Sequence, residues 1–436
     1  MEEKLLLGVG RTVITPKIGE HLYGYPDPPE STSVHDDLTA TAFYFKQGDK
    51  ATVLVSNTVC SIPEDIAKTI ADEIEKRHGI PKEAILLHAI HTHSGPSLYS
   101  SEFGWGDINT EYRDGIFIPN ILAAVNNAIN NVKSVKMAIA SGESYVGINR
   151  RELTAENRVI LGQNPWGPFN PKMTVISFKG DDGAPVANIV HYGAHPTAAG
   201  KNTEISRDWP GVMIDVLEAE TGAVTAFING PEGDVGPRLT NGLTVGLGDI
   251  NNAMRLGAVA AQDAVRIYKK TGGYYTPKLS CNSKKVKIPL LPRLTPEEAN
   301  AQIEEYKKEI YHPNVRKRMT KYYTKIIDSY KTDYVDKENF EFNQNIIRLG
   351  DVAIVAFPYE LFSEIGMRID RASEIAHVLS IVNTNGAYAY FPTESELCRG
   401  GYEIQSFTMR NTQPYVHDAD WYAVTETLKN LKELKE

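Results

Sequence analysis

Apolar and polar positions along the chain follow two periods, and the alternation between these periods predicts strands and helices in turn. The runs 39–45 and 51–59 are rich in β-branched and aromatic residues, which is typical of buried strands. Residues 63–79 place apolar side chains at helical spacing, with Pro63 at the start and Gly79 at the stop. The apolar run that follows completes a βαβ-like unit.

The two periods continue to alternate over the rest of the chain. Helices are expected at 117–132, 208–222 (with Asp208 as N-cap), 249–270 and 418–436. Strands are expected at 136–149, 223–230, 344–358 and 377–392, and strand pairs at 172–193 and 273–292. The pattern predicts an α/β fold with a mixed β-sheet core flanked by helices.

The stretch 295–337 differs in composition, because Glu, Lys, Arg and Tyr dominate it. It predicts an exposed helical insertion of two helices joined by a break at His312–Pro313. A lid or arm over a site and a solvated hairpin without functional consequence both fit this pattern. No repeat or linker divides the chain, so a single catalytic domain over residues 1–436 is expected.

Composition narrows the classes of protein. The 436 residues are 42% hydrophobic and 23% charged, with a formal net charge of −9, so nucleic acid is not an expected partner. No apolar stretch approaches the ~20 residues of a membrane span, and the first residues lack the features of a secretory signal. Cys60, Cys281 and Cys398 are few and far apart, which is typical of reduced thiols. A cytoplasmic location is expected, and the oligomeric state is left open.

A His-Thr-His triplet follows one predicted strand. His91 and His93 are two residues apart, so both rings leave the same face if the strand continues to that point. Two converging imidazoles ligate a metal, or one of them ligates while the other transfers protons. The alternative is a pair of core histidines bonded to the backbone.

The triplet belongs to the stretch "LLHAIHTHSGP", in which an apolar strand ends on polar residues beside Gly or Pro. Three later stretches show the same pattern. They are "NIVHYGAHPT", "AFINGPEGDVGPR" and "VAIVAFPYELFSEIG". Ligands gather at the carboxyl ends of strands in open α/β sheets. The histidines and carboxylates there have the composition of a zinc site with an open position for water. Spacing alone does not show that they meet.

These motifs, in this order, resemble the catalytic amino-terminal domain of the neutral/alkaline non-lysosomal ceramidases. The resemblance begins at "VGRTVITP" and "VHDDLTATAF", continues through "INR", and ends in "NGAYAYFPTESELCRGGYE", so it covers nearly the whole chain. It implies a zinc-dependent hydrolase that cleaves an amide (C–N) bond of a lipid-like substrate by a metal-activated water. Full members carry a carboxy-terminal β-sandwich domain that is not expected here, so a smaller soluble N-acyl substrate is expected instead of a membrane-borne lipid.

The resemblance also implies the site residues. A single Zn²⁺ is held by His91, His195, Glu360 and Tyr390. The neighbouring alternatives are His191 for His195, Glu364 for Glu360 and Tyr388 for Tyr390. The proline after His195 marks a strand end, which favours His195 over His191.

Further residues are implied beside the metal. His93 takes or returns a proton, and Arg150 and Tyr402 stabilise the oxyanion of the tetrahedral intermediate. Arg151 is the alternative to Arg150, and a surface salt bridge is the ordinary role of either. These assignments also suit a zinc esterase or lactonase, and a family member that binds a ligand without turnover.

One loop departs from the family pattern. It reads Gly-Asp-Val-Gly-Pro over 233–237, where the ceramidases have serine at the position of Gly236. The missing hydroxyl puts a serine-dependent step and ceramide itself in doubt. Gly236 either opens the pocket beside the zinc as a specificity adaptation or serves the backbone. Asp234 and Asp208 are candidates to orient a ligand histidine, with loop capping the simpler role of Asp208.

Overall fold

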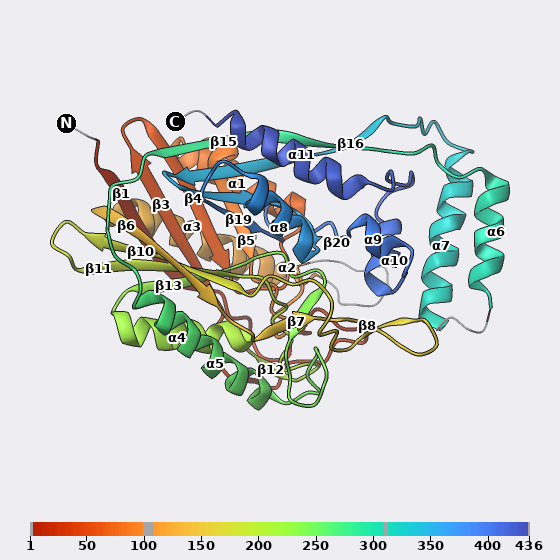
Figure 1. The fold of residues 1–436 in the computed structure, drawn as a ribbon, viewed down its shortest axis with the longest axis horizontal. Coiled ribbons are helices and arrows are strands. Elements are labelled where there is room, and N and C mark those ends of the chain that lie inside the picture. Colours follow the sequence, from red (N-terminus) through yellow and green to blue (C-terminus); the bar gives the residue numbers. More distant parts are fainter. Residues whose placement is uncertain (1–2, 99–107, 309–312, 435–436) are drawn as a thin grey trace.

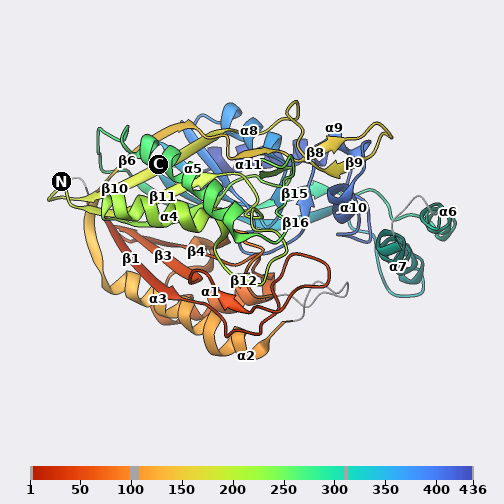
Figure 2. The same cartoon turned by 90° about the horizontal axis from the view of Figure 1, so that it is seen from below.

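Four layers, in the order helix, sheet, sheet, helix, make up the protein (Figures 1 and 2). The computed structural model describes residues 3–98, 108–308 and 313–434. Two sheets pack face to face through one apolar core, and helices cover the outer face of each. The predicted α/β fold, a mixed sheet flanked by helices, is confirmed.

The larger sheet has eight strands in the spatial order β13-β11-β10-β6-β1-β3-β4-β5. Their bounds, in chain order, are β1 Leu5–Val13, β3 Thr39–Gln47, β4 Lys50–Asn57, β5 Ile85–Ala89, β6 Val132–Glu143, β10 Lys172–Gly180, β11 Pro185–Tyr192 and β13 Val224–Asn229. The outermost pair at each edge is parallel, and each of these pairs is joined across a helix. The predicted βαβ unit is β4, α1 (Glu64–His78) and β5, and α1 ends at Gly79 with φ 67°.

Four long helices cover the outer face of this sheet. They are α1, α3 (Ile118–Asn130, preceded by the short α2, Thr110–Tyr112), α4 (Asp208–Thr221) and α5 (Ile250–Tyr268). Two glycines of β1 let α3 lie against the sheet: a Cβ on Gly8 would stand 1.8 Å from the carbonyl oxygen of Ala128, and one on Gly10 2.1 Å from that of Ala124. The N-cap of α4 is Arg207, so the prediction that Asp208 is the N-cap is wrong by one residue.

The second sheet has the order β15-β16-β17-β19. Its strands are β15 Leu279–Pro289, β16 Asn339–Leu349, β17 Val352–Ala356 and β19 His377–Ile381, and α8 (Ser363–Ala372) and α11 (Ala419–Lys432) cover its outer face. The predicted strand pair at 273–292 is wrong, because β15 pairs with β16 about fifty residues later. The alternation of apolar and polar side chains predicts that a segment is a strand, but it does not predict which other strand pairs with it.

The predicted helical insertion lies between β15 and β16. It consists of α6 (Pro296–Tyr306), which begins with a capping box of Thr295 and Glu298, and α7 (Pro313–Ser329). The pair, here called the helical arm, projects at the end of the molecule away from the N-terminus in both views (Figures 1 and 2). It has a small core of its own around Met319 and Tyr323. Of the predicted break, Pro313 begins α7 and His312 lies outside the described residues.

Short strand pairs join the loops that follow the long strands. They are β2 (Ser33–Val34) with β12 (Glu204–Ile205), β7 (Gly147–Asn149) with β14 (Val235–Pro237), β8 (Arg151–Leu153) with β9 (Val159–Leu161), and β18 (Glu360–Leu361) with β20 (Tyr390–Phe391). The short helices α9 (Glu394–Leu397) and α10 (Tyr402–Thr408) follow β20. These pairs bring the later motifs together at one place. None of the described helices is long and apolar enough to cross a membrane.

Candidate metal centre

A pocket of about 490 Å³ lies where the loops after β4, β5 and β19 meet α7 and α10. His91, His93 and Glu360 line its inner part. His195 comes from the loop after β11, and one of its ring nitrogens reaches Glu360. The carbonyl oxygen of Glu232, in the loop after β13, contacts His195 Nδ1, so all four stretches that the sequence singled out meet in space.

Three of the predicted ligands form one cluster. Ligand atoms of His91, His195 and Glu360 all lie within 4.8 Å of one another. His195 Nε2 is 3.1 Å and His91 Nε2 is 3.5 Å from the same oxygen, Oε2, of Glu360. Such spacing suits a divalent cation held by two imidazoles and a carboxylate.

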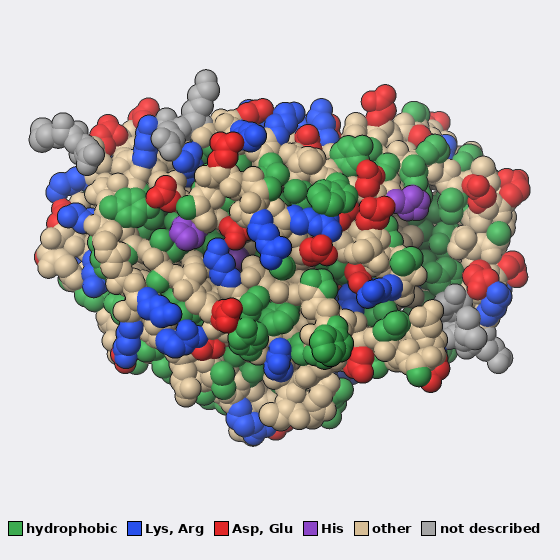
Figure 3. Space-filling model, in the orientation of Figure 1, with side chains coloured by type: hydrophobic (Ala, Val, Ile, Leu, Met, Phe, Trp, Pro, Cys, Tyr) green, Lys and Arg blue, Asp and Glu red, His purple; other side chains and the backbone are tan. Residues whose placement is uncertain are grey.

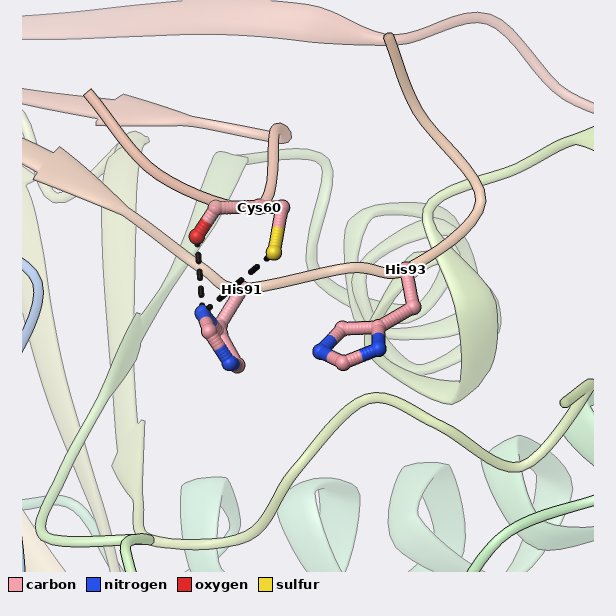
Figure 4. A group of neighbouring side chains, drawn as sticks. All are labelled: Cys60, His91 and His93. Atoms are coloured by element: carbon pink, nitrogen blue, oxygen red, sulfur yellow. Dashed lines mark hydrogen bonds between the residues drawn. The ribbon is translucent and has the colours of Figure 1, made fainter. Parts of the chain in front are cut away.

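The argument from strand alternation for His91 and His93 is wrong, although the two rings do come together. β5 ends at Ala89, and His91 lies beyond it. Its φ of 75° is a left-handed backbone conformation that residues other than glycine seldom adopt. The triplet is therefore a turn. Its two rings are 4.9 Å apart between centroids, and Figure 4 shows them side by side with Cys60 next to His91.

Backbone carbonyls fix how the two histidines are protonated. His91 Nδ1 lies 2.8 Å from the carbonyl oxygen of Cys60, and His195 Nδ1 lies 2.9 Å from that of Glu232. A carbonyl oxygen only accepts, so each Nδ1 carries a hydrogen and each Nε2 is turned toward Glu360. Burial, with the charge of Arg150, lowers the pKa of His195 to about 3, so this ring is neutral.

The cluster consequently lacks a hydrogen where it needs one. Neutral His195 has no N–H left for its 3.1 Å contact with Glu360 Oε2, so two acceptors face each other. Burial acts to raise the pKa of Glu360, but neighbouring charges, among them that of Arg150, lower it to about 2, which keeps the carboxylate ionised. The donor set therefore fits a cation and is unfavourable without one.

The alternatives for two ligands lie elsewhere. His191 Nε2 is bonded to the carbonyl oxygen of Ser380, 2.9 Å away. Glu364 is on α8 and pairs with Arg368 at 2.8 Å. Neither belongs to the cluster.

Tyr390 reaches the cluster through strand pairing. β18 and β20 are parallel and place Tyr390 opposite Glu360, and the Tyr390 ring stacks on His195 with centroids 6.4 Å apart. The preceding Ala389 has φ 78°, a strained conformation of the kind that persists at functional sites. The alternative, Tyr388, points elsewhere and donates its hydroxyl to Glu64.

His93 is the histidine of the pocket without a fixed partner. Neither of its ring nitrogens has a hydrogen-bond partner among the described residues. Burial and the neighbouring His91 lower its pKa well below the usual value, so the ring is a neutral acceptor. Gly24 makes room for it: with φ 122°, a Cβ there would stand 2.4 Å from His93 Nδ1.

Arg150 and Arg151 are both buried, so the surface salt bridge considered for either is wrong. They share the carboxylate of Glu403, at 3.0 Å from Arg150 Nε and 2.6 Å from Arg151 Nη1. The Arg150 guanidinium lies 5.3 Å from the centroid of the Tyr390 ring, and its Nη2 has no described partner. Arg150 therefore keeps a spare donor beside the metal cluster, whereas Arg151 also binds Glu396 and the chain at Gly400.

Tyr402, the other predicted oxyanion donor, begins α10 and lines the pocket. Its ring lies 5.4 Å from that of Tyr390 between centroids. Burial and the charge of Glu360 raise the pKa of its phenol, so the hydroxyl remains a donor at neutral pH.

Neither predicted aspartate contacts a ligand histidine. Asp234 accepts from the Ser363 N–H (2.7 Å) and from Asn149 Nδ2 (3.2 Å), so its carboxylate ties its loop to α8. Asp208, at φ 56°, accepts from the N–H groups of Ala198 and Ala199 and so caps the loop after His195. The predicted orienting role is wrong for both carboxylates.

Gly236 does not open the pocket. It lies in β14, opposite Ile148 of β7, and is not among the residues that line the cavity. A Cβ at this position would stand 2.6 Å from Thr244 Cβ and 2.9 Å from the Thr244 carbonyl oxygen. The expected specificity role is replaced by a packing role, and because φ is not positive here, the reason is space rather than backbone conformation.

Three residues of the site were not predicted. Glu232 is fully buried, accepts from Asn383 Nδ2 at 2.9 Å, and has its pKa raised by burial and by Glu360. Glu403 holds the two arginines, and Cys60 lies against His91. Glu232 and Glu403 are within motifs quoted above, so their position was the available signal, whereas no pattern marks Cys60.

The chain is similar to proteins of one family. Residues 5–249 match a family model described as neutral/alkaline non-lysosomal ceramidase, N-terminal. No curated protein sequence matches the chain. A solved neutral ceramidase from Pseudomonas aeruginosa has a TM-score of 0.74 at 19% identity, covering 100% of this chain and 76% of its own. A solved ceramidase complexed with C2 has a TM-score of 0.75 at 18% identity, covering 99% and 75%. At these identities, the likeness to solved structures concerns the fold.

Proposed function

Because the chain belongs to the neutral/alkaline non-lysosomal ceramidase family, we propose that it is a zinc-dependent hydrolase of N-acyl amide bonds. His91, His195, Glu360 and Tyr390 would hold the ion. The observation that carries the metal site is the convergence of two histidine Nε2 atoms on one ionised carboxylate oxygen. Nitrogen and oxygen donors of this kind suit zinc.

The chemistry divides between the ion and the chain. When bound, zinc supplies Lewis acidity, which polarises an amide carbonyl and makes water a stronger acid near neutral pH. Hydrolysis breaks the C–N bond, joins the water oxygen to the acyl carbon and delivers a proton to the leaving nitrogen. His93 is neutral and unpartnered, so its ring nitrogen can accept that proton from water and return it to the nitrogen.

Arg150 and Tyr402 serve the developing negative charge on the carbonyl oxygen. Arg150 is held from behind by Glu403 and keeps Nη2 as an unused donor, so little rearrangement is needed when the charge forms. A pre-positioned donor of this type contributes roughly 3 kcal/mol to transition-state stabilisation. A short N-acyl amide is the substrate that we propose in place of long-chain ceramide.

Metal content and matched substrates test this function. We expect about one zinc ion per chain in the purified protein. His195→Gln should lose most of it, whereas His191→Gln, which removes the neighbouring buried imidazole outside the cluster, should retain it. Full zinc occupancy in both variants would exclude the proposed ligand set.

Activity is compared on N-octanoyl and O-octanoyl compounds that share one leaving group, and on a long-chain ceramide. Turnover of the amide above that of the ester supports the amidase. Preference for the ester would make the protein an esterase, turnover of neither would make it a binding member of the family, and efficient cleavage of ceramide would overturn the short-chain proposal.

A further inference from the structure

The outer part of the pocket is lined by basic side chains. Arg318, Lys321 and Lys325 of α7 and Arg410, just after α10, line it, and Glu360 at the metal cluster is the sole carboxylate among the described lining residues. The three residues of α7 are spaced by three and four positions, so they form one stripe along the helix. The helical arm therefore presents a cationic face to the pocket.

This local charge is opposite to that of the whole protein. The chain carries a net charge of −9, and on the face shown in Figure 3 basic and acidic side chains are interspersed over the body. A general surplus of basic residues consequently does not explain the stripe. A local cationic wall in an acidic protein attracts anions toward that wall despite the net negative charge.

Arg410 is held so that its charge remains available. Its guanidinium carbon lies 4.1 Å from the centroid of the Tyr388 ring and 5.6 Å from that of Phe340. Tyr388 is itself fixed by the hydrogen bond that it donates to Glu64. No carboxylate among the described residues is within ion-pair distance of Arg410, and its buried Nε has no hydrogen-bond partner.

Lys325 is a second cation that lines the same cavity. It lies on an exposed part of α7 and has no ion-pair partner among residues 3–98, 108–308 and 313–434. Several other surface lysines are paired, as Lys285 is with Glu341 and Lys331 with Asp328. Two cations without an ion-pair partner among the described residues, lining one cavity, are an arrangement that binds an oxyanion.

We propose that Arg410 and Lys325 form an anion subsite, and that the substrate is an N-acyl amide whose amine part carries a carboxylate or phosphate group. The proposal rests on the proposed function, because it extends the same pocket away from the metal cluster. Tyr390 of β20, which stacks on His195, and Tyr388, which stacks on Arg410, are two residues apart, so this segment connects the reacting end to the anion end. Hydrolysis of such a substrate releases a fatty acid and an anionic amine.

Four N-octanoyl amides that differ in one terminal group test the proposal. They are 3-aminopropanoate (carboxylate), 3-aminopropyl phosphate, 3-aminopropanol (neutral) and 1,3-diaminopropane (cationic) derivatives. We expect kcat/KM for at least one anionic amide to exceed that of the neutral amide about tenfold, and the cationic amide to be the poorest. The better of the two anionic substrates identifies the group.

Variants locate the effect. In Arg410→Gln and in Lys325→Gln the ratio of kcat/KM between anionic and neutral amides should fall about tenfold, and Arg410→Lys should restore part of it. Lys317→Gln removes one charge from the exposed surface of the same helix outside the pocket, so its ratio should stay that of the wild type. A loss of the same size in Lys317→Gln would show a general field and overturn the subsite.

Binding separates this proposal from the proposed function. Matched sulfonamides, in which a sulfonyl group replaces the acyl carbonyl, are titrated calorimetrically into wild-type protein. Tighter binding of the anionic sulfonamide, lost in Arg410→Gln, supports the subsite even if none of the amides is hydrolysed, in which case only the hydrolase fails. Equal binding of anionic and neutral sulfonamides, or equal hydrolysis of the corresponding amides, would overturn the subsite and leave the hydrolase standing.

Discussion

The two ends of the pocket differ in how their charged groups are held. At the inner end, His91, His195 and Glu360 are buried, and backbone carbonyls fix the orientation of both imidazoles. At the outer end, Lys325 is exposed and Arg410 rests on aromatic rings without an ion-pair partner among the described residues.

This difference follows from what each end must do. A metal and its reacting groups need side chains placed within a fraction of an ångström, which buried groups with backbone partners provide. Recognition of a substrate tail needs charge but tolerates movement, which long side chains on a helix provide. Substitutions at the inner end should therefore damage metal binding and stability, whereas those at the outer end should change selectivity.

The largest expected effect is at the carboxylate of the metal cluster. Glu360→Gln removes the ionised oxygen that both histidines approach, so metal affinity should fall by about 100-fold or more, beyond what loss of an outer partner causes. Glu364→Gln is the matched control, because Glu364 pairs with Arg368 on α8 and should leave affinity unchanged. Competition with a chromogenic chelator measures both. Similar affinities for the two variants would place the metal elsewhere.

The next effect concerns Glu403, the carboxylate behind the inner end. Glu403→Gln leaves two buried guanidinium groups without their shared counter-charge, so the free energy of unfolding should fall by about 3–5 kcal/mol. Glu396→Gln is the control, since Glu396 is more exposed and binds only Arg151 of the two. Urea denaturation compares them. If both variants lost the same free energy of unfolding, the greater burial of the Glu403 ion pairs would not explain their contribution to stability.

The sequence predicts some parts of this inner end better than others. The elements that supply its residues are predicted well, because side-chain period and helix stop signals such as Gly79 are local. The motifs also bring out His91, His195 and Glu360 rather than their neighbours. The turn at His91 is missed, since its left-handed conformation arises from tertiary contacts and not from residue preference.

Long-range contacts explain the other differences. β15 and β16 pair across the helical arm, and Glu403 meets Arg150 from about 250 positions away, so no local pattern reports either contact. The packing of Gly236 against Thr244 is of the same kind. The resemblance to the family drew attention to the serine hydroxyl that Gly236 lacks. The contact with Thr244 shows instead that there is no room for a side chain at this position.

A pH-dependent effect is expected at Asp234. Burial raises its pKa to about 7, above the unfolded value of 3.8, so the folded protein holds this proton more tightly. The resulting stability is present below pH 4 and is lost as pH rises through 7. Asp234→Asn cannot titrate, so from pH 5 to pH 8 the wild type should lose roughly 2–3 kcal/mol relative to the variant. Urea denaturation at both pH values, with the same ion bound, checks this. A constant difference would show that Asp234 is already ionised at pH 5.

The smallest expected effect distinguishes packing from specificity at Gly236. Gly236→Ala adds the single carbon that would meet Thr244, so it should reduce the free energy of unfolding by about 1–3 kcal/mol. Gly236→Ser should cost as much and should not raise ceramide hydrolysis, because its hydroxyl would point into the β14–Thr244 contact rather than the cavity. A gain in ceramide turnover with Gly236→Ser would instead show that the serine reaches the substrate, and that the inner end tolerates more movement than its buried contacts imply.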